Sequence, residues 1–409
     1  MNDLRRIWLK AAALGSASVL LPRTLLARDD ILGPSDLPQG FLETGTLDNL
    51  PGKMPLIRKS FRPPNFETPI SYFQEAFTPN NAFFVRYHVA DIPQIDAEQW
   101  RLTISGDAAG KSVQFSLNDL ETQFEQVEIN ALCMCSGNRR GLFNPHVPGV
   151  EWGHGAMGNA RWKGVRLKDL LAKADVQKNA LEVGFNGTDR APMSQSPDYV
   201  KSLPIWKALD ENTLIAYEMN GEPLPHWNGF PARIVVPGWT ATYWMKHVTE
   251  INVSSKPVEG FWMKPGYRIP KGKFPIVARF VSQDTEANTP ITEMVVNSLI
   301  TNMGANETFE EGSTTLLRGV AWDGGFGIAT VEVSMDNGQT WRRAALAKDL
   351  GKFSWRQWNF PLKFDKAGKY IVMARATNRV GATQTFELIA NPAGYHHNVV
   401  QQIHIDVVS

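Results

Sequence analysis

Cys135-Ser136-Gly137-Asn138-Arg139-Arg140 places a thiol beside two guanidinium groups, in a 409-residue chain with only two cysteines. A thiolate is a soft ligand that suits a transition metal. The planar donor forks of arginine fit a tetrahedral oxyanion. The stretch therefore indicates redox chemistry on an oxyanion at a metal. One thiolate does not identify the metal, and a structural cysteine in a basic loop explains these six residues equally well.

Further motifs stand around this stretch in a fixed order: Phe84-Val85-Arg86-Tyr87-His88, Glu151-Trp152-Gly153, Gly158–Leu167, Ala216–Gly221, Asn228–Arg233, Val236-Pro237-Gly238 and Gly266–Pro270. In this order and spacing the set resembles the sulfite oxidase family of molybdenum enzymes, and most of all its bacterial periplasmic sulfite dehydrogenases. The resemblance runs from about Phe61 to the C-terminus. It implies a catalytic molybdenum subunit.

Length and pattern favour two domains. Short β runs and helix candidates at Arg166–Ala174 and Trp206–Leu209 indicate an α+β domain, which the resemblance makes a molybdopterin-binding catalytic domain over residues 61–284. After about residue 300 the chain alternates apolar and polar residues, with an Asn337-Gly338 hairpin signal. We expect an all-β immunoglobulin-like sandwich over residues 285–409, which mediates dimerisation in the resembled family.

The N-terminus reads as an export signal. Arg5-Arg6 precedes an apolar run, Ala11–Leu21, that is shorter than the roughly 20 residues needed to cross a bilayer. The pattern predicts a twin-arginine signal peptide at residues 1–27, export of a folded protein to the periplasm, and no membrane span in the mature chain. Residues 28–60 are expected to form an extended arm.

The resemblance assigns roles to residues of the motifs. Cys135 falls on the family's molybdenum ligand, and Arg86 and Arg140 fall on its anion-binding arginines. Tyr267 falls on the active-site tyrosine, whose phenol can donate a hydrogen bond and shuttle a proton. Trp152 is expected to wall the substrate pocket, although core packing explains it nearly as well. Cys133 reads as a small buried hydrophobe.

The resemblance also implies a set of residues that hold the molybdopterin: Phe84, Val85, Arg86, His88, Asp189, Asn228, Arg233 and Lys246. Arg233 has a fork suited to the pterin phosphate. One position departs from the family pattern, because the vertebrate enzymes have His where this chain has Asn228, with His226 two residues earlier. The sequence leaves open which of the two contacts the pterin.

Charge and missing motifs limit the partners. The net charge is +1 and no Lys/Arg run of the nucleic-acid type occurs, so nucleic acid is not expected as a partner. The sequence has no Cys-x-x-Cys-His haem attachment motif and no cytochrome b5-like His-Pro-Gly-Gly segment. We therefore expect a mononuclear molybdenum-molybdopterin centre without haem, and electrons that leave to a separate c-type cytochrome.

The leading interpretation is oxidation of sulfite to sulfate. The sulfane dehydrogenase subunit of the thiosulfate-oxidising complex is the nearest alternative, but that branch tends to have Ser in place of Arg140. A periplasmic molybdenum reductase is a more distant alternative. From a different class, a non-enzymatic binding module could use the sandwich domain for protein contacts, and it would contain no molybdenum.

Overall fold

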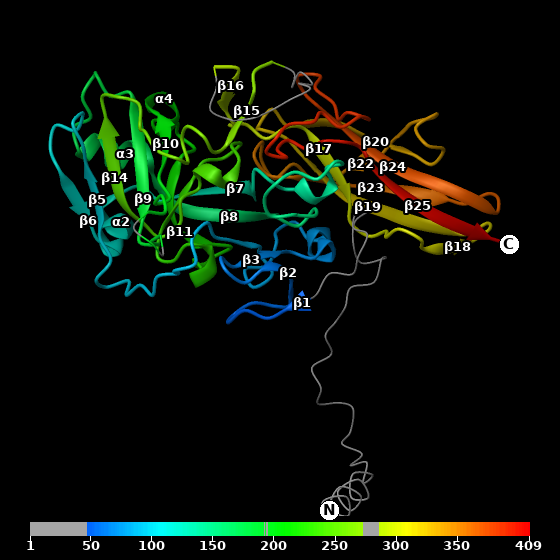
Figure 1. Ribbon diagram of the computed structural model, residues 1–409. Helices are drawn as coiled ribbons and strands as arrows, with labels where there is room; N and C mark the ends of the chain where they lie inside the picture. Colours follow the sequence, from blue (N-terminus) through cyan, green and yellow to red (C-terminus); the bar gives the residue numbers. More distant parts are fainter. Residues whose placement is uncertain (1–46, 192, 194, 273–285) are drawn as a thin grey trace, which may run out of the picture.

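Two β-rich domains lie next to each other in the computed structural model (Figure 1), which describes residues 47–191, 193, 195–272 and 286–409. The expected signal peptide and most of the expected arm lie outside the described residues. The first domain carries a four-stranded antiparallel sheet, a five-stranded mixed sheet and a third, antiparallel sheet, and the second is a sandwich of two sheets. The predicted order of an α+β domain followed by an all-β sandwich is confirmed.

The first domain holds three sheets, ordered β1-β2-β3-β4, β10-β9-β14-β5-β6 and β12-β11-β8-β7, with β13 paired to β11. Their bounds are β1 Leu47–Asp48, β2 Leu56–Ser60, β3 Asn65–Glu67, β4 Val85–Arg86, β5 Leu102–Ser105, β6 Val113–Phe115, β7 Val127–Met134, β8 Met157–Arg166, β9 Glu182–Gly187, β10 Lys201–Pro204, β11 Leu214–Met219, β12 Glu222–Pro223, β13 Arg233–Val235 and β14 Val248–Ser254.

Short helices pack on the outer part of this domain. α3 (Leu167–Lys173) and α4 (Ile205–Ala208) confirm the two helix candidates. α2 (Leu117–Gln123) begins with a capping box between Ser116 and Asp119, a local signal that the sequence analysis missed. Single 3-10 turns complete the set: η1 Ile70–Gln74, η2 Arg140–Leu142, η3 His226–Asn228 and η4 Ala241–Tyr243.

The expected arm needs correction at its C-terminal end. β1 and β2 come from residues before 61, yet β2 pairs with β3, and β3 pairs with β4, the strand that contains Arg86. Lys53, between β1 and β2, is buried and donates to the carbonyl of Phe83 over 3.0 Å. Residues 47–60 therefore belong to the catalytic domain.

The second domain packs the sheet β17-β19-β23-β22 against β18-β25-β24-β20-β21. Asn337 and Gly338 both have positive φ, as predicted for the hairpin turn. A β15-β16 pair precedes this domain. The bounds are β15 Arg268–Pro270, β16 Asn288–Pro290, β17 Asn297–Ile300, β18 Thr308–Glu310, β19 Thr314–Trp322, β20 Ile328–Ser334, β21 Arg342–Arg343, β22 Ala345–Leu346, β23 Arg356–Lys363, β24 Gly368–Asn378 and β25 Gln401–Val408.

The pleat of β7 joins the two domains. Successive side chains of a strand point to opposite faces. Cys133 belongs to the core of the first domain, whereas Leu132 and Met134 belong to a second cluster with Trp322 and Trp355 of the sandwich. In Figure 1, β7 and β8 lie between the main body of the first domain and the sandwich.

Arg139 stabilises the same interface between the two domains. It is buried and donates to the side chain of Asn297 and, over 2.8 Å, to the carbonyl of Ser298. Its guanidinium lies 5.5 Å from the ring centroid of Trp322. Burial lowers the pKa of Arg139 to about 9, which still leaves it charged at pH 7. The first arginine of the Arg139-Arg140 pair therefore serves the domain interface.

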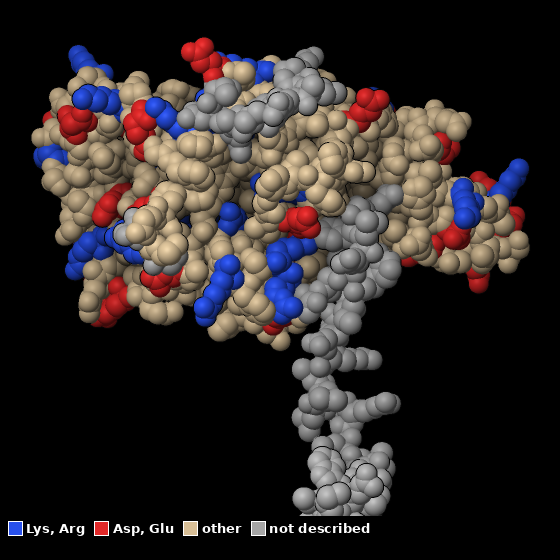
Figure 2. All heavy atoms as spheres, viewed as in Figure 1, with Lys and Arg blue, Asp and Glu red and all other residues tan. Residues whose placement is uncertain are grey.

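The outer surface has mixed charge, with Lys and Arg interspersed among Asp and Glu on the face shown in Figure 2. Within the described part of the chain, no helix combines the length and apolarity required to cross a membrane.

Gly164 in β8 offers a test of the close packing of β8 against β11. A Cβ there would lie 2.0 Å from the carbonyl oxygen of Ile215 and 2.6 Å from Cα of Ala216, which are backbone atoms that cannot move aside. We expect Gly164→Ala to lower the free energy of unfolding by about 2–3 kcal/mol. Gly184→Ala, in β9, is the matched control, because its nearest neighbour would be 3.4 Å away. Equal denaturation midpoints for the two variants would contradict this packing.

Candidate active site

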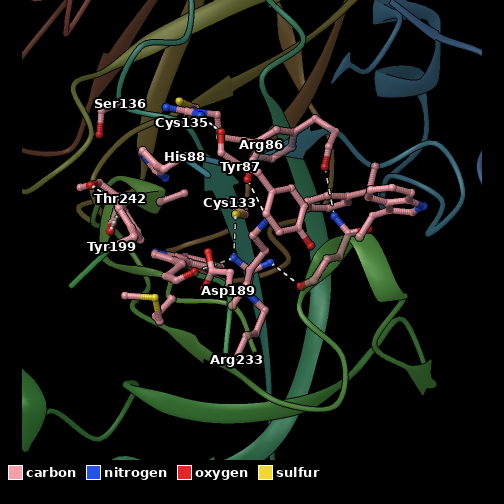
Figure 3. Close-up of a pocket in the computed structure, with 18 of the residues that line it drawn as sticks. Arg86, Tyr87, His88, Cys133, Cys135, Ser136, Asp189, Tyr199, Arg233 and Thr242 are labelled. Atoms are coloured by element: carbon pink, nitrogen blue, oxygen red, sulfur yellow. Dashed lines mark hydrogen bonds between the residues drawn. The ribbon is translucent and has the colours of Figure 1, made fainter. Parts of the chain in front are cut away.

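A cleft of about 640 Å³, including the space at its open mouth, lies in the first domain beside the end of β7. It brings together most of the residues assigned from the motifs: Phe84, Arg86, His88, Cys135, Asp189, Asn228, Arg233, Lys246 and Tyr267. Figure 3 shows Cys135 and Arg86 at one end, Asp189 and Arg233 at the other, and Cys133 between them.

Cys135 is held at the point where β7 ends. Its N–H donates to the carbonyl of Ala156, and its carbonyl accepts from the N–H of Asn138, so the backbone on both sides of the thiol is fixed. Cys133 lines the same cleft two residues earlier. Burial raises the pKa of the Cys133 thiol to about 11, which keeps it protonated. Cys135 remains the predicted ligand.

A second group surrounds Tyr267. Its hydroxyl forms a hydrogen bond with Nε2 of His88, and its backbone has a φ of 61°, a left-handed conformation that is uncommon outside glycine. The His88 ring stacks on Tyr199 with centroids 3.7 Å apart. Burial holds the pKa of His88 well below its usual range, so the ring is neutral at pH 7. Three nearby cations act in the same direction: Arg86, Lys246 and Lys201.

The opposite end of the cleft is rich in buried cations. Arg233 donates to the carbonyls of Asn228 and Trp244, over 2.9 and 3.0 Å, and its Nε has no partner among the described residues. Lys246 donates to the carbonyl of Arg86 over 2.7 Å. Burial raises the pKa of Asp189 and lowers that of Lys246. Oδ1 of Asp189 also lacks a partner within the described part of the chain.

These residues fit the implied cofactor. Within the described chain, Arg86, Arg233 and Lys246 have no carboxylate within salt-bridge distance. Buried polar groups are normally hydrogen-bonded, so the unused Arg233 Nε and Asp189 Oδ1 call for a polar ligand. A phosphate-bearing pterin supplies an acceptor for the first and donors for the second. The described residues contain no cluster of His, Cys, Asp and Glu that could hold a metal without such a cofactor.

The structure distinguishes Asn228 from His226. Asn228 lines the cleft, and its Nδ2 donates to the carbonyl of Phe84 over 3.0 Å, whereas His226 is outside the lining. Lys53 donates to Oδ1 of Asn228 over 2.5 Å and thereby fixes the orientation of the amide. Burial lowers the pKa of Lys53 to about 7. The sequence analysis missed this lysine because it lies in the segment assigned to the arm.

Three of the assigned residues do not line the cleft: Val85, Arg140 and Trp152. Trp152 is fully buried behind the Cys135 loop. Arg140 donates from Nε to the carbonyl of Ala393 over 2.8 Å, and its guanidinium lies 5.3 Å from the ring centroid of Tyr395. The Tyr395 ring stacks on Tyr267, with centroids 5.7 Å apart and planes within 8°. The substrate contacts assigned to Arg140 and Trp152 therefore stay predictions.

Several lining residues had been given no role from the sequence, namely Tyr87, Ser136, Tyr199, Trp227, Thr242, Trp244 and Met245. Tyr87 stood inside an assigned motif, yet its hydroxyl contacts Nε2 of His247 over 2.7 Å. Tyr199 comes from the residues just before β10 and donates to the carbonyl of Thr242. Only the three-dimensional arrangement of β10 and η4 reveals these contributions.

Comparisons with known proteins agree with this geometry. Residues 89–262 match the family described as "Oxidoreductase molybdopterin binding domain", and residues 288–408 match "Mo-co oxidoreductase dimerisation domain". The mitochondrial sulfite oxidase of Rattus norvegicus is 34% identical over 405 residues, covering 94% of this chain and 72% of the relative. The chain belongs to the sulfite oxidase family of molybdenum enzymes.

Two further comparisons, one with a relative and one with a solved structure, agree with this membership of the sulfite oxidase family. The mitochondrial sulfite oxidase of Homo sapiens is 36% identical over 352 residues, covering 82% of this chain and 63% of the relative. The crystal structure of the sulfane dehydrogenase SoxCD from Paracoccus pantotrophus matches with a TM-score of 0.72 at 25% identity, over 84% of this chain and 85% of that one. The predicted molybdopterin cofactor and dimerisation domain are thereby supported.

Cys135→Ser is expected to abolish turnover, because it replaces a soft thiolate donor by a hydroxyl. Circular dichroism should show an unchanged fold, since the side chains have similar size. Cys133→Ser is the matched control on the same strand face and should keep most of the activity. Loss of turnover in the Cys133 variant with an active Cys135 variant would refute the assignment.

Proposed function

We propose that this protein oxidises sulfite to sulfate in the periplasm and passes the electrons to an external c-type cytochrome. Sulfite and water yield sulfate, two protons and two electrons. When bound, the molybdenum cofactor supplies the two-electron acceptor and the oxygen-transfer chemistry at the Cys135 end of the cleft. The observation that carries the proposal is the grouping of Arg86, His88 and Tyr267 in the cleft that contains Cys135.

Arg86 supplies the positive charge for the anion. It lines the cleft and is half-buried, and the groups in electrostatic contact with it include Tyr267, Cys135 and Tyr199. It donates hydrogen bonds to Oδ1 of Asn65 and to the backbone carbonyl of Tyr87, which are neutral oxygens, and no carboxylate of the described residues lies within salt-bridge distance. A guanidinium in such a setting binds a small dianion through charge-assisted hydrogen bonds.

Tyr267 and His88 are suited to handle a proton beside the anion. Because the ring of His88 is neutral, one nitrogen can accept the hydrogen of the Tyr267 hydroxyl. The phenol can then orient the substrate oxygens and pass a proton toward the imidazole during turnover. A lowered imidazole pKa keeps this acceptor available across the neutral range.

The choice of sulfite is supported by the relatives. The rat and human proteins, 34% and 36% identical to this chain, are named sulfite oxidases. The similarity to the sulfane dehydrogenase structure favours a second candidate, oxidation of a sulfane-type substrate. Arg140, which the sulfane branch tends to replace by Ser, favours sulfite.

Arg86→Gln is expected to raise KM for sulfite by roughly 10- to 100-fold, because one charge-assisted contact is worth about 1.5–3 kcal/mol. Tyr267→Phe should act mainly on kcat, since it removes a proton-bearing group and little binding charge. Steady-state kinetics of the molybdenum-loaded variants separates the two effects.

Arg140→Gln tests the second arginine assigned to the substrate. If Arg140 binds substrate as first predicted, KM rises as for Arg86→Gln, and an unchanged KM assigns Arg140 to the Tyr395 contact.

The electron acceptor can be tested with the purified protein. We expect sulfite-dependent reduction of a c-type cytochrome, with a rate that falls as ionic strength rises if charge steers the encounter. Removal of residues 1–27, which contain four basic residues and one acidic residue, leaves a net charge of −2. Thiosulfate-derived substrates are assayed in parallel. Rapid oxygen consumption with formation of hydrogen peroxide, and no cytochrome reduction at any salt concentration, would identify an oxidase instead.

A further inference from the structure

Lys201, the first residue of β10, is a buried cation next to the active-site tyrosine that no motif assigned. Its side chain is 1% exposed. Nζ donates to the carbonyl of Trp262 over 2.7 Å, and it lies 4.7 Å from the ring centroid of Tyr243 and 5.3 Å from that of Tyr267. One carbonyl and two aromatic rings therefore surround the ammonium group.

The described residues supply no carboxylate within salt-bridge distance of Lys201. Glu182 is the nearest acidic group in electrostatic terms, but its Oε2 accepts hydrogen bonds from Ser202 and from the N–H of Val258. Burying a cation without a carboxylate partner costs free energy. Burial accordingly lowers the pKa of Lys201 to about 7, so the side chain is charged on the acid side of neutrality. Such a residue is unfavourable for stability, so a role in the adjacent site accounts for it better than packing alone.

The geometry ties Lys201 to Tyr267 from two directions. Directly, the ammonium faces the electron-rich ring of Tyr267, an attraction of the cation–π type. The indirect link runs through Tyr243. The Lys201 ammonium lies over the Tyr243 ring, and the Tyr243 hydroxyl donates to the carbonyl of Ile291 over 2.7 Å. The N–H of Ile291 in turn donates to the carbonyl of Tyr267 over 2.9 Å. Lys201 thus contacts the ring of Tyr267 directly and is linked to the backbone of Tyr267 through Tyr243 and Ile291.

We infer that Lys201 is a positioning residue that acts through Tyr267: its charge holds the phenol ring and keeps the hydrogen-bonded His88 in the neutral form that accepts the phenol hydrogen. This inference rests on the proposed function of the Tyr267–His88 pair. A positive charge nearby disfavours a second positive charge on the imidazole and favours negative charge on the phenol oxygen. The first effect keeps the imidazole in the neutral form that accepts the hydrogen bond of the phenol, and the second lowers the cost of removing the phenol proton.

Other charged and titratable groups also face the pair, and they remain in place in a Lys201 variant. Those facing His88 are Arg86, Lys246 and Tyr199, and those facing Tyr267 are Arg86, Cys135, Arg140 and Tyr395. Removal of the Lys201 charge therefore leaves the other charged and titratable groups around Tyr267 and His88 unchanged.

Lys201→Met is the decisive variant, because it keeps the length of the side chain and removes the charge. Without this charge the pKa of His88 should rise. As the pH is lowered, the imidazole then becomes protonated at a higher pH than in the wild type. We expect the acid limb of the kcat profile to move up by about one pH unit, with the sulfite KM at the optimum unchanged within about threefold. Lys201→Arg keeps the charge and should restore the wild-type profile.

Lys207→Met is the matched control. Lys207, on the neighbouring α4, is also buried and lies 5.7 Å from the ring centroid of Trp239, but its Nζ pairs with Asp210 over 2.9 Å. This variant should leave the acid limb in place. Molybdenum content and the thermal unfolding midpoint are recorded for every variant, so that a loss of structure or cofactor is recognised as such.

The outcomes are separable. Wild-type turnover with sulfite tests the proposed function alone, and the variants are compared on whichever sulfur substrate the wild type oxidises. An acid limb of Lys201→Met that coincides with those of wild type and Lys207→Met overturns the role of Lys201. So does a further fall in kcat when Lys201→Met is added to Tyr267→Phe, since an effect through the hydroxyl vanishes in that background. If Lys201→Met does not fold, a shifted profile in folded Lys201→Arg overturns the inference and a wild-type profile supports it.

Discussion

The two-residue period of β7 is the constraint on which the rest of the molecule depends. One face of the strand carries Cys133 and leads to Cys135 at the cleft, and the other face carries Leu132 and Met134 into the sandwich domain. A shift of one residue in the register would exchange these faces. The thiol would then point into an apolar interface, and two apolar side chains would fill the cofactor cleft. Catalytic site and domain interface are therefore specified by one strand.

The second organising feature is buried positive charge without matching carboxylates. Arg86, Arg233 and Lys246 line one cleft, and Lys53 and Lys201 support it from outside the lining. Such charges destabilise an isolated protein, since burial penalises an ion that lacks a counter-ion. They become favourable when an anionic cofactor and an anionic substrate occupy the cleft. The free energy that folding loses at these positions is recovered on binding.

The sequence predicted the parts of the molecule that depend on local pattern. The domain order, α3, the Asn337-Gly338 turn and the grouping of Cys135, Arg86 and Tyr267 all follow from motifs or periodicity. Residues that reach the cleft from outside a motif could not be predicted. Lys53 sits in a segment without periodicity, and Lys201 is one residue of a short strand whose neighbours are set by packing. Arg140 was assigned to substrate, but its neighbours Ala393 and Tyr395 lie more than 250 positions later.

The contact of Arg140 and Tyr267 with the segment that contains Ala393 and Tyr395 has a consequence for how such enzymes diversify. The sandwich domain is more than a means of assembly, because its last loop forms one wall behind the catalytic tyrosine. A recombination event that attached a different sandwich to the same catalytic domain would replace the support of Tyr267 at the same moment. Substitutions in the loop between β24 and β25 would therefore change the packing around Tyr267 and Arg140 without altering any residue that lines the cleft.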